Sequence, residues 1–289
     1  MTELFCGCSD VPRDSRMFYR IATAVEYRVG LFSPPKARVL KAWAEEAQKA
    51  ASPMRSIWVA WQAFTHRAGD IRKGHGLKLQ EGENAANLGH FRATAENRRV
   101  WEKIKEQAQN VGASHILLET PASFSPSSPN KLALTAFVKE WALLPENMKL
   151  VWHPAGFWSR EESMALAESL GMILAIDPLV DEKEELPKSD AIYLQMLGRR
   201  GLMDSYSDDD LERILNVAAR YDDVTIIFRT SDSLGDATRL LKLSETYEPE
   251  DDFEFDEDDD FVDDSDEAFD DDEDDDEAFD DDEGSLDEE

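Results

Sequence analysis

Short runs of apolar and β-branched residues alternate along the chain with longer segments whose apolar positions recur every three or four residues. The short runs predict eight strands, at residues 4–8, 24–28, 57–61, 115–120, 149–152, 173–176, 192–196 and 224–228. The clearest helical segments are 35–50, 94–111, 131–143, 160–170, 208–221 and 235–245. This alternation is typical of an α/β protein with a parallel (β/α)8 TIM-type barrel, and a doubly wound open sheet is the alternative.

The barrel prediction also indicates where function belongs, because such barrels carry their sites at the C-terminal ends of the strands. Residues 67–91 have no clear apolar period and are rich in Gly, Asn, Lys and Glu. We therefore expect a long loop after the third strand, of the kind that often serves as a lid or binding loop. Ser159 and Ser207 each precede a carboxylate by three residues, which predicts two helix starts.

The charge of the chain is divided between two different parts. The formal net charge is −32, and residues 248–289 hold 29 of the 63 acidic side chains without a single Lys or Arg. Residues 1–247 carry 34 acidic and 31 basic side chains and are nearly neutral. We therefore predict a barrel domain at 1–247 and a disordered acidic tail at 248–289, because like charges at this density repel and the tail has little apolar area to bury.

The acidic tail has two interpretations. It can be a solubilising segment without a dedicated partner, or it can dock on basic proteins, with its rings in pockets and its carboxylates on Lys and Arg. Its five aromatic side chains favour the second interpretation, and they are Phe253, Phe255, Phe261, Phe269 and Phe279. The tail could also fold back on the arginines of the barrel mouth. We expect no direct binding of nucleic acid, because the tail repels phosphate.

The start of the chain lacks the basic residues and long apolar run of a signal peptide, and no later segment approaches membrane-spanning length. These features predict a cytoplasmic protein with no membrane partner. Cys6 and Cys8 are interpreted as small core residues rather than a metal or redox pair, because no nearby His completes a site. Most of the seven Trp residues are likewise interpreted as core side chains rather than sugar-stacking groups.

A series of short motifs runs through residues 1–247. They are Asp10-Val-Pro, Val25-Glu26, Phe32-Ser-Pro-Pro35, Trp43-Ala-Glu-Glu, Ala60-Trp-Gln-Ala-Phe-Thr-His66, Phe91-Arg-Ala-Thr94, Thr120-Pro-Ala-Ser-Phe124, Ile176-Asp-Pro178 and Gly235-Asp-Ala237. In order and spacing they resemble the YecE-like domain of unknown function 72 (DUF72) family. The resemblance implies a TIM-type barrel and says little about a reaction.

At the strand ends the chain departs from the pattern that the resemblance implies. Relatives tend to show a Lys at Val59, a carboxylate at His153, an Arg at Ala155, Arg-Leu-His at residues 195–197, Asn at Arg229 and a polar amide at Arg28. The changes remove charged groups that acid–base catalysis or anion binding would use. We therefore expect a family pocket that has been dismantled or rebuilt for a different ligand.

Three polar positions of the family pattern are retained, at Glu26, His66 and Asp177. They could form a residual acid–base cluster, or they could bond to loop backbone at the barrel rim as structural residues. Glu119 and His153 are expected near the same rim. The dispersed spacing of these groups predicts no metal site, and the sequence indicates no cofactor.

Basic residues follow the last two predicted strands. Gly198-Arg199-Arg200-Gly201 comes after the seventh strand and Arg229 after the eighth, where barrels commonly bind phosphate. Together with Gln195 and His153, they predict a site for a small phosphate-like anion. The alternative is a surface turn with two solvated arginines.

Two classes of function therefore remain. One is a binding or adaptor protein with a degenerate pocket and an acidic tail for basic partners. The other is an enzyme or small-anion binder that acts at the strand C-terminal face. The missing charges favour the first class and the retained Glu26, His66 and Asp177 favour the second, so the sequence leaves catalysis open and favours a binding protein.

Overall fold

The computed structural model describes residues 2–12, 15–71, 77–180, 185–198 and 205–248. The chain divides into two units, Met1–Asp251 and Asp252–Glu289, and all described residues belong to the first. The acidic segment predicted to be disordered therefore lies outside the described residues from Pro249 onward, as do Arg199, Arg200 and Gly201. The domain boundary and the tail assignment stay predictions.

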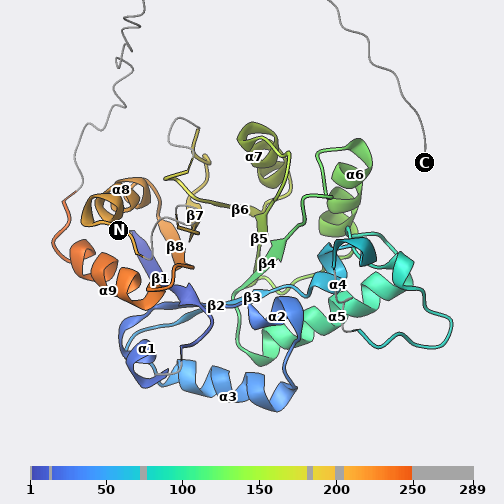
Figure 1. Cartoon of the computed structure of the whole chain (residues 1–289), viewed down its shortest axis with the longest axis horizontal. Helices are drawn as coiled ribbons and strands as arrows, with labels where there is room; N and C mark the ends of the chain where they lie inside the picture. The colour runs from blue at the N-terminus through green and yellow to red at the C-terminus, as the bar shows by residue number, and fades with distance from the viewer. Residues whose placement is uncertain (1, 13–14, 72–76, 181–184, 199–204, 249–289) are drawn as a thin grey trace, which may run out of the picture. The chain divides into compact units, whose positions relative to one another are not determined.

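Eight parallel strands close into a barrel in which each strand pairs with the next and β8 pairs with β1 (Figure 1). The strands are β1 (Glu3–Ser9), β2 (Ala24–Tyr27), β3 (Arg55–Val59), β4 (His115–Glu119), β5 (Lys149–His153), β6 (Ile173–Ile176), β7 (Ala191–Met196) and β8 (Asp223–Phe228). The predicted TIM-type fold is confirmed, and the open sheet is excluded because β1 and β8 are joined along six residue pairs.

Helices surround this ring (Figure 1). They are α1 (Ser15–Ile21), α2 (Val29–Phe32), α3 (Ala37–Gln48), α4 (Gln62–Thr65), α5 (Ala95–Asn110), α6 (Ser128–Ala136), α7 (Arg160–Ser169), α8 (Asp208–Ala218) and α9 (Ser233–Ser244). Both predicted serine caps are present, since Ser159 accepts from the Glu162 amide and Ser207 forms a capping box with Asp210. Among the described residues, no helix lies between β6 and β7.

Two segments differ from the helices and loops that the sequence predicts. The helix expected at 131–143 begins earlier, at Ser128, because Pro129 is well accommodated in the first turn of a helix. Its last part widens into a π-helix, η3 (Phe137–Trp141). The long loop at 67–91 contains two short 3₁₀ turns, η1 (Ala68–Asp70) and η2 (Ala85–Asn87).

The core has two parts, one inside the barrel and one beneath the helices. The inner part is small and is formed by Ala24, Leu31, Ile57, Val59, Leu117, Val151, Ala175, Tyr193 and Ile227. The outer part contains the fully buried Trp58, Trp101 and Trp152. Cys6 and Cys8 are buried free thiols of the same outer part, which confirms their interpretation as core residues.

The end of the loop after β3 has an unusual backbone. Gly89, His90 and Phe91 are three consecutive residues with positive φ angles, of 82°, 52° and 54°. Asn97 on α5 holds this turn in place, because its side chain accepts from the Gly89 amide at 3.0 Å and donates to the Gly89 carbonyl at 3.1 Å. A Cβ on Gly89 would lie 2.1 Å from the carbonyl oxygen of His66, so only glycine fits there.

No helix in the described part of the chain is long and apolar enough to span a bilayer.

Candidate functional site

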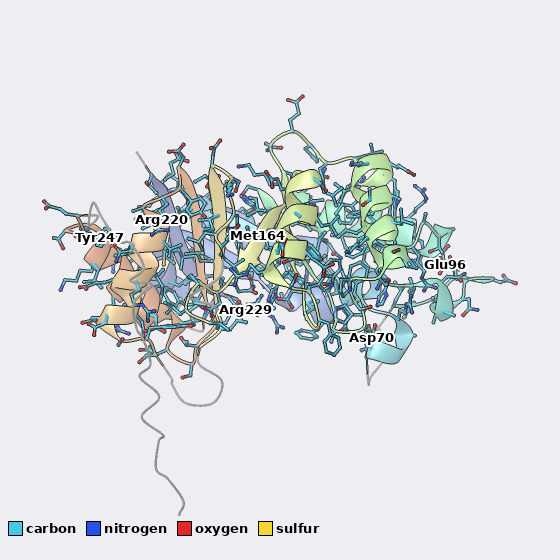
Figure 2. All side chains as sticks on the ribbon, turned by 90° about the horizontal axis from the view of Figure 1, so that it is seen from above. Asp70, Glu96, Met164, Arg220, Arg229 and Tyr247 are labelled. Carbon is cyan, nitrogen blue, oxygen red and sulfur yellow. The ribbon has the colours of Figure 1, made fainter. Side chains whose placement is uncertain are left out.

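Four charged side chains meet at the C-terminal ends of the strands. Glu26 lies on β2, Glu119 ends β4, and Arg28 and Arg229 follow β2 and β8. Because the barrel closes β8 onto β1 and β2, residues some two hundred positions apart in sequence become neighbours. Figure 2 shows Arg229 near the middle of the view, between Tyr247 on one side and Asp70 and Glu96 on the other.

Glu26 is the buried centre of this cluster and has no exposed surface. One oxygen accepts from Ser9 Oγ at 2.7 Å and from Arg229 at 3.0 Å (Nε) and 2.5 Å (Nη2). The other oxygen accepts from Tyr193 Oη at 2.7 Å and from Gln195 Nε2 at 3.0 Å. Five hydrogen bonds occupy this carboxylate, so little of its capacity to accept a hydrogen bond from a ligand remains.

Glu119 joins the two arginines. It bonds to Nη2 of Arg229 on the buried side, and to Arg28 on the outer side through Nε at 3.4 Å and Nη2 at 3.2 Å. The Arg28 guanidinium lies 5.2 Å from the centre of the Phe32 ring, a cation–π contact. The side chain of Arg28 is 34% exposed and those of Glu119 and Arg229 are each 11% exposed, so Arg28 is the outermost member of the cluster.

The carboxylates and guanidiniums of the cluster stabilise one another's charges. Burial alone would raise the pKa of Glu119, but the guanidinium charges of Arg229 and Arg28 outweigh burial and hold that pKa below its usual value. Burial also disfavours the charge on Arg229, yet Glu26 and Glu119 raise the pKa of Arg229 above its usual value. Glu119 and Arg229 therefore stay ionised against each other, in a cluster of two carboxylates and two guanidiniums.

His153 and Tyr193 complete the surroundings of the cluster. Burial lowers the pKa of His153. The nearby charge of Arg229 also lowers this pKa, whereas the charge of Glu119 raises it. Burial and the charge of Glu26 raise the pKa of Tyr193 well above its usual value. His153 is therefore a neutral imidazole and Tyr193 a neutral hydroxyl donor near pH 7, so neither adds a charge to the cluster.

The structure brings together only part of each predicted residue set. Glu26 bonds to Gln195 and Arg229 from the predicted anion site, and His153 lies beside them. The expected loss of charge at the changed strand ends stays a prediction, but two of the changed positions carry a charge in this chain. Arg28 and Arg229 introduce two guanidiniums that pair with Glu119 and Glu26, while Val59 packs in the inner core.

Asp177 occupies a structural position at the rim. Its carboxylate accepts from the backbone amides of Leu179 at 3.1 Å and Leu197 at 3.2 Å, which ties the end of β6 to the end of β7. Gly198 has a positive φ of 77°, and its amide donates to Tyr206 Oη at 2.7 Å. These bonds match the structural interpretation of Asp177, in which the carboxylate holds loop backbone.

His66 belongs to a second group of polar side chains. Its Nδ1 lies 2.8 Å from Thr65 Oγ1, and it interacts electrostatically with Asp70. In this group His90 Nε2 lies 3.2 Å from Ser123 Oγ and 3.4 Å from Asp70 Oδ2, and burial lowers the pKa of His90 to about 4. Hydroxyl and carboxylate meet the same ring nitrogen of His90, so Ser123, His90 and Asp70 lack the two-sided geometry of a Ser–His–Asp triad.

Sequence reasoning missed Ser9 and Tyr193, which both donate to Glu26. Ser9 is the last residue of β1, and its position at a strand end could have indicated that it belongs to the site. Tyr193 lies in the middle of an apolar strand. Side chains alternate between the two faces of β7, and only the assignment of Tyr193 to the inner face would have indicated its role. The position of Arg28 was noticed as a change, but its partner Glu119 could be found only from the closed barrel.

Comparison with solved structures places the fold of this chain among known barrels. A DUF72 family protein from Enterococcus faecalis aligns with a TM-score of 0.57 at 11% identity, over 86% of this chain and 97% of that chain. The barrel is DUF72-like. A DUF72 family protein from Thermotoga maritima gives a TM-score of 0.54 at 14% identity, over 84% of this chain and 98% of that chain.

At 11% and 14% sequence identity, the similarity to these DUF72 proteins shows the fold alone. No protein-family model matches the sequence, and no curated protein matches it. The DUF72-like barrel is therefore shown, whereas the YecE-like assignment and the divergence of the pocket stay predictions.

Proposed function

We propose that this chain is a non-catalytic binding or adaptor protein, in which a DUF72-like barrel carries an acidic segment for basic partners. The observation that supports this proposal is the mutual neutralisation of the charged groups at the strand ends. Glu26 accepts five hydrogen bonds and Arg229 lies between two carboxylates. A general acid or base needs a titratable proton within reach of a ligand, and these groups are already committed to one another.

The composition of residues 248–289 supplies the second part of the proposal. Its 29 carboxylates attract basic surfaces over a Debye length, and its five Phe rings can each add apolar contact. A segment of this kind binds by combining charge attraction with a few anchoring rings. The barrel serves as the folded body to which this segment is attached.

The small-anion alternative meets an obstacle at Arg229. An anion there would have to displace Glu26 or Glu119 from a largely buried guanidinium, which would leave a carboxylate without its partner. The Gly198 amide is likewise engaged, with Tyr206. These contacts favour the binding-protein proposal over a phosphate site at Gly198, Gln195, His153 and Arg229. Arg199 and Arg200, the other residues predicted for that site, lie outside the described residues.

The proposal is tested by binding of a synthetic Lys- and Arg-rich peptide to three chains at several salt concentrations. The chains are the full-length protein, a truncation after Tyr247, and a full-length variant with Ser in place of Phe253, Phe255, Phe261, Phe269 and Phe279. We expect the truncation to abolish binding. The Ser variant keeps every charge, so weaker binding by this variant at all salt concentrations would show that the rings contribute.

Equal binding by the full-length chain and the truncation would exclude the tail as the partner site. Equal binding by the full-length chain and the Ser variant would reduce the tail to a charged solubilising segment. Titration of the full-length chain with inorganic phosphate, followed by calorimetry, checks the alternative function directly.

A further inference from the structure

The cluster at the barrel mouth has hydrogen-bonding groups that its own contacts do not use. Within the described residues, the hydrogen bonds of Arg28 and Arg229 run through Nε and Nη2, and none engages Nη1 of either side chain. Gln195 is 1% exposed, and its Oε1 is a buried acceptor without a hydrogen-bond partner among the residues that the structure describes. A buried acceptor of this kind usually has a water or a ligand group as its partner.

His153 adds a donor and an acceptor to the same mouth. Its side chain is half-buried at the end of β5, and a neutral imidazole carries one N–H group and one bare nitrogen. The unused groups of the mouth are therefore a mixture of donors and acceptors. Hydroxyl groups match such a mixture best, because each hydroxyl can donate and accept at once.

The charge of the mouth selects against ionic ligands. Among the described residues Glu26 and Glu119 are paired with Arg28 and Arg229, and the carboxylate of Asp10 acts on both Glu26 and Arg28, so the cluster holds no excess of positive charge and an ionic ligand must compete with an existing ion pair. A neutral ligand can bond to the outer N–H groups of both guanidiniums without breaking either pair. The balance of charge thus favours an uncharged, polar molecule.

Two exposed aromatic rings stand at the same end of the barrel. Phe32 ends α2, shortly after β2, and is 52% exposed, whereas Phe157 follows β5 and is 85% exposed. Gly156, with a φ of 88°, packs the loop before Phe157 against Ala122 in the loop after β4. An exposed ring that is held by an ordered loop offers a flat apolar face to a ligand.

We propose that the barrel mouth binds a neutral sugar, with its hydroxyls on Arg28, Arg229, Gln195 and His153 and its apolar C–H face against an exposed phenylalanine ring. Polyhydroxylated rings combine the two properties that the mouth requires, which are many hydroxyls and a flat apolar face. This site goes beyond the proposed function, because it lies in the barrel and needs no acidic segment.

The test is a titration of the full-length chain with a panel of neutral monosaccharides and with their phosphate esters, followed by calorimetry and saturation-transfer NMR. We expect at least one neutral sugar to bind, and its phosphate ester to bind no more tightly. Phe157→Ala should weaken binding by roughly three- to tenfold, the range expected for one aromatic contact. Leu132→Ala is the matched control, because Leu132 is 69% exposed on α6 and Ala favours a helix.

Both substitutions replace exposed side chains, so circular dichroism melting curves should match that of the parent chain. Absence of binding by every neutral sugar would overturn the proposal. A phosphate ester that binds tenfold more tightly than its parent sugar, or inorganic phosphate that competes with the sugar, would show an anion site instead. Equal weakening of sugar binding by Phe157→Ala and Leu132→Ala would also overturn the placement of the sugar at the barrel mouth.

Discussion

The two ends of the barrel both carry buried ion pairs, but they use them differently. At the strand N-terminal end, Asp223 is shared by Arg55 and by Lys149 at 3.0 Å, and Arg55 also donates to Thr225 Oγ1 at 2.7 Å. The Arg55 guanidinium lies 3.7 Å from the centre of the Phe5 ring, so the aromatic ring covers one of its faces. The charged side chains at this end pack against one another and close the barrel.

At the strand C-terminal end, two carboxylates pair with two guanidiniums, and in the described part of the chain the Nη1 donors of Arg28 and Arg229 and the Gln195 Oε1 acceptor have no partner. The difference shows that an ion-pair cluster can close a barrel at one end and still offer a polar surface at the other. It also predicts unequal costs when each cluster is disrupted, because the carboxylate left behind is more deeply buried at the C-terminal end.

The largest effect is expected for Arg229→Met. Glu26, which has no exposed surface, and Glu119 would both lose their main cation, and removal of one partner from a buried pair costs about 3–5 kcal/mol of unfolding free energy. Urea unfolding followed by circular dichroism measures this loss. Addition of Glu26→Gln and Glu119→Gln to the same chain should restore part of it. A loss below about 1 kcal/mol would mean that water already screens the cluster.

The next effect is a loss of stability in acid through His115, at the start of β4. Burial, aided by the charge of Arg55, lowers the pKa of His115 to about 3. The unfolded chain takes up this proton near its ordinary pKa of about 6.5, so stability falls as the pH drops from that value towards 3, by roughly 3 kcal/mol at pH 4.

Replacement of His115 by Gln, which does not titrate in this range, should flatten the pH dependence of urea unfolding between pH 6.5 and 4. The His153→Gln variant makes the same comparison at the other end of the barrel. A chain with His115→Gln that keeps the full acid sensitivity would assign that sensitivity to other groups, such as His90.

The smallest effect is expected for Arg55→Met at the N-terminal end. Asp223 keeps Lys149 as its partner and its side chain is 22% exposed, so we expect a loss of only about 1–2 kcal/mol in urea unfolding. A loss as large as that of Arg229→Met would remove the proposed difference between the two ends.

The fold could be predicted from the sequence because its signals are local. Apolar runs predicted strands whose ends agree with the structure to within two residues, and Ser159 and Ser207 correctly indicated two helix starts. Some residues of the site could also be predicted from the sequence, since Glu26, Gln195 and Arg229 were each named as candidate site residues. These residues are connected only by the closure of the barrel, which depends on the pairing of all eight strands.

The grouping within the site could not be predicted, because a strand end does not reveal which way its last side chain points. Asp177 faces loop amides although it directly follows β6 as Arg229 follows β8, and His66, which follows the short α4 after β3, lies beside Thr65. Arg28 looked like a substituted polar residue, and its partner Glu119 lies two strands away. Direction and distance at a barrel rim are tertiary properties, and local sequence patterns do not contain them.

The left-handed turn at Gly89, His90 and Phe91 limits how this barrel can be recombined with others. Asn97 on α5 grips both backbone groups of Gly89, and the side chain of Arg92 donates to the carbonyls of Ala86, Leu88 and Gly89. A chimera that exchanges the loop without the first turn of α5 would leave this backbone without its clamp. The exchangeable module therefore extends from the end of β3 to Asn97, and junctions placed inside it should lower the yield of folded protein.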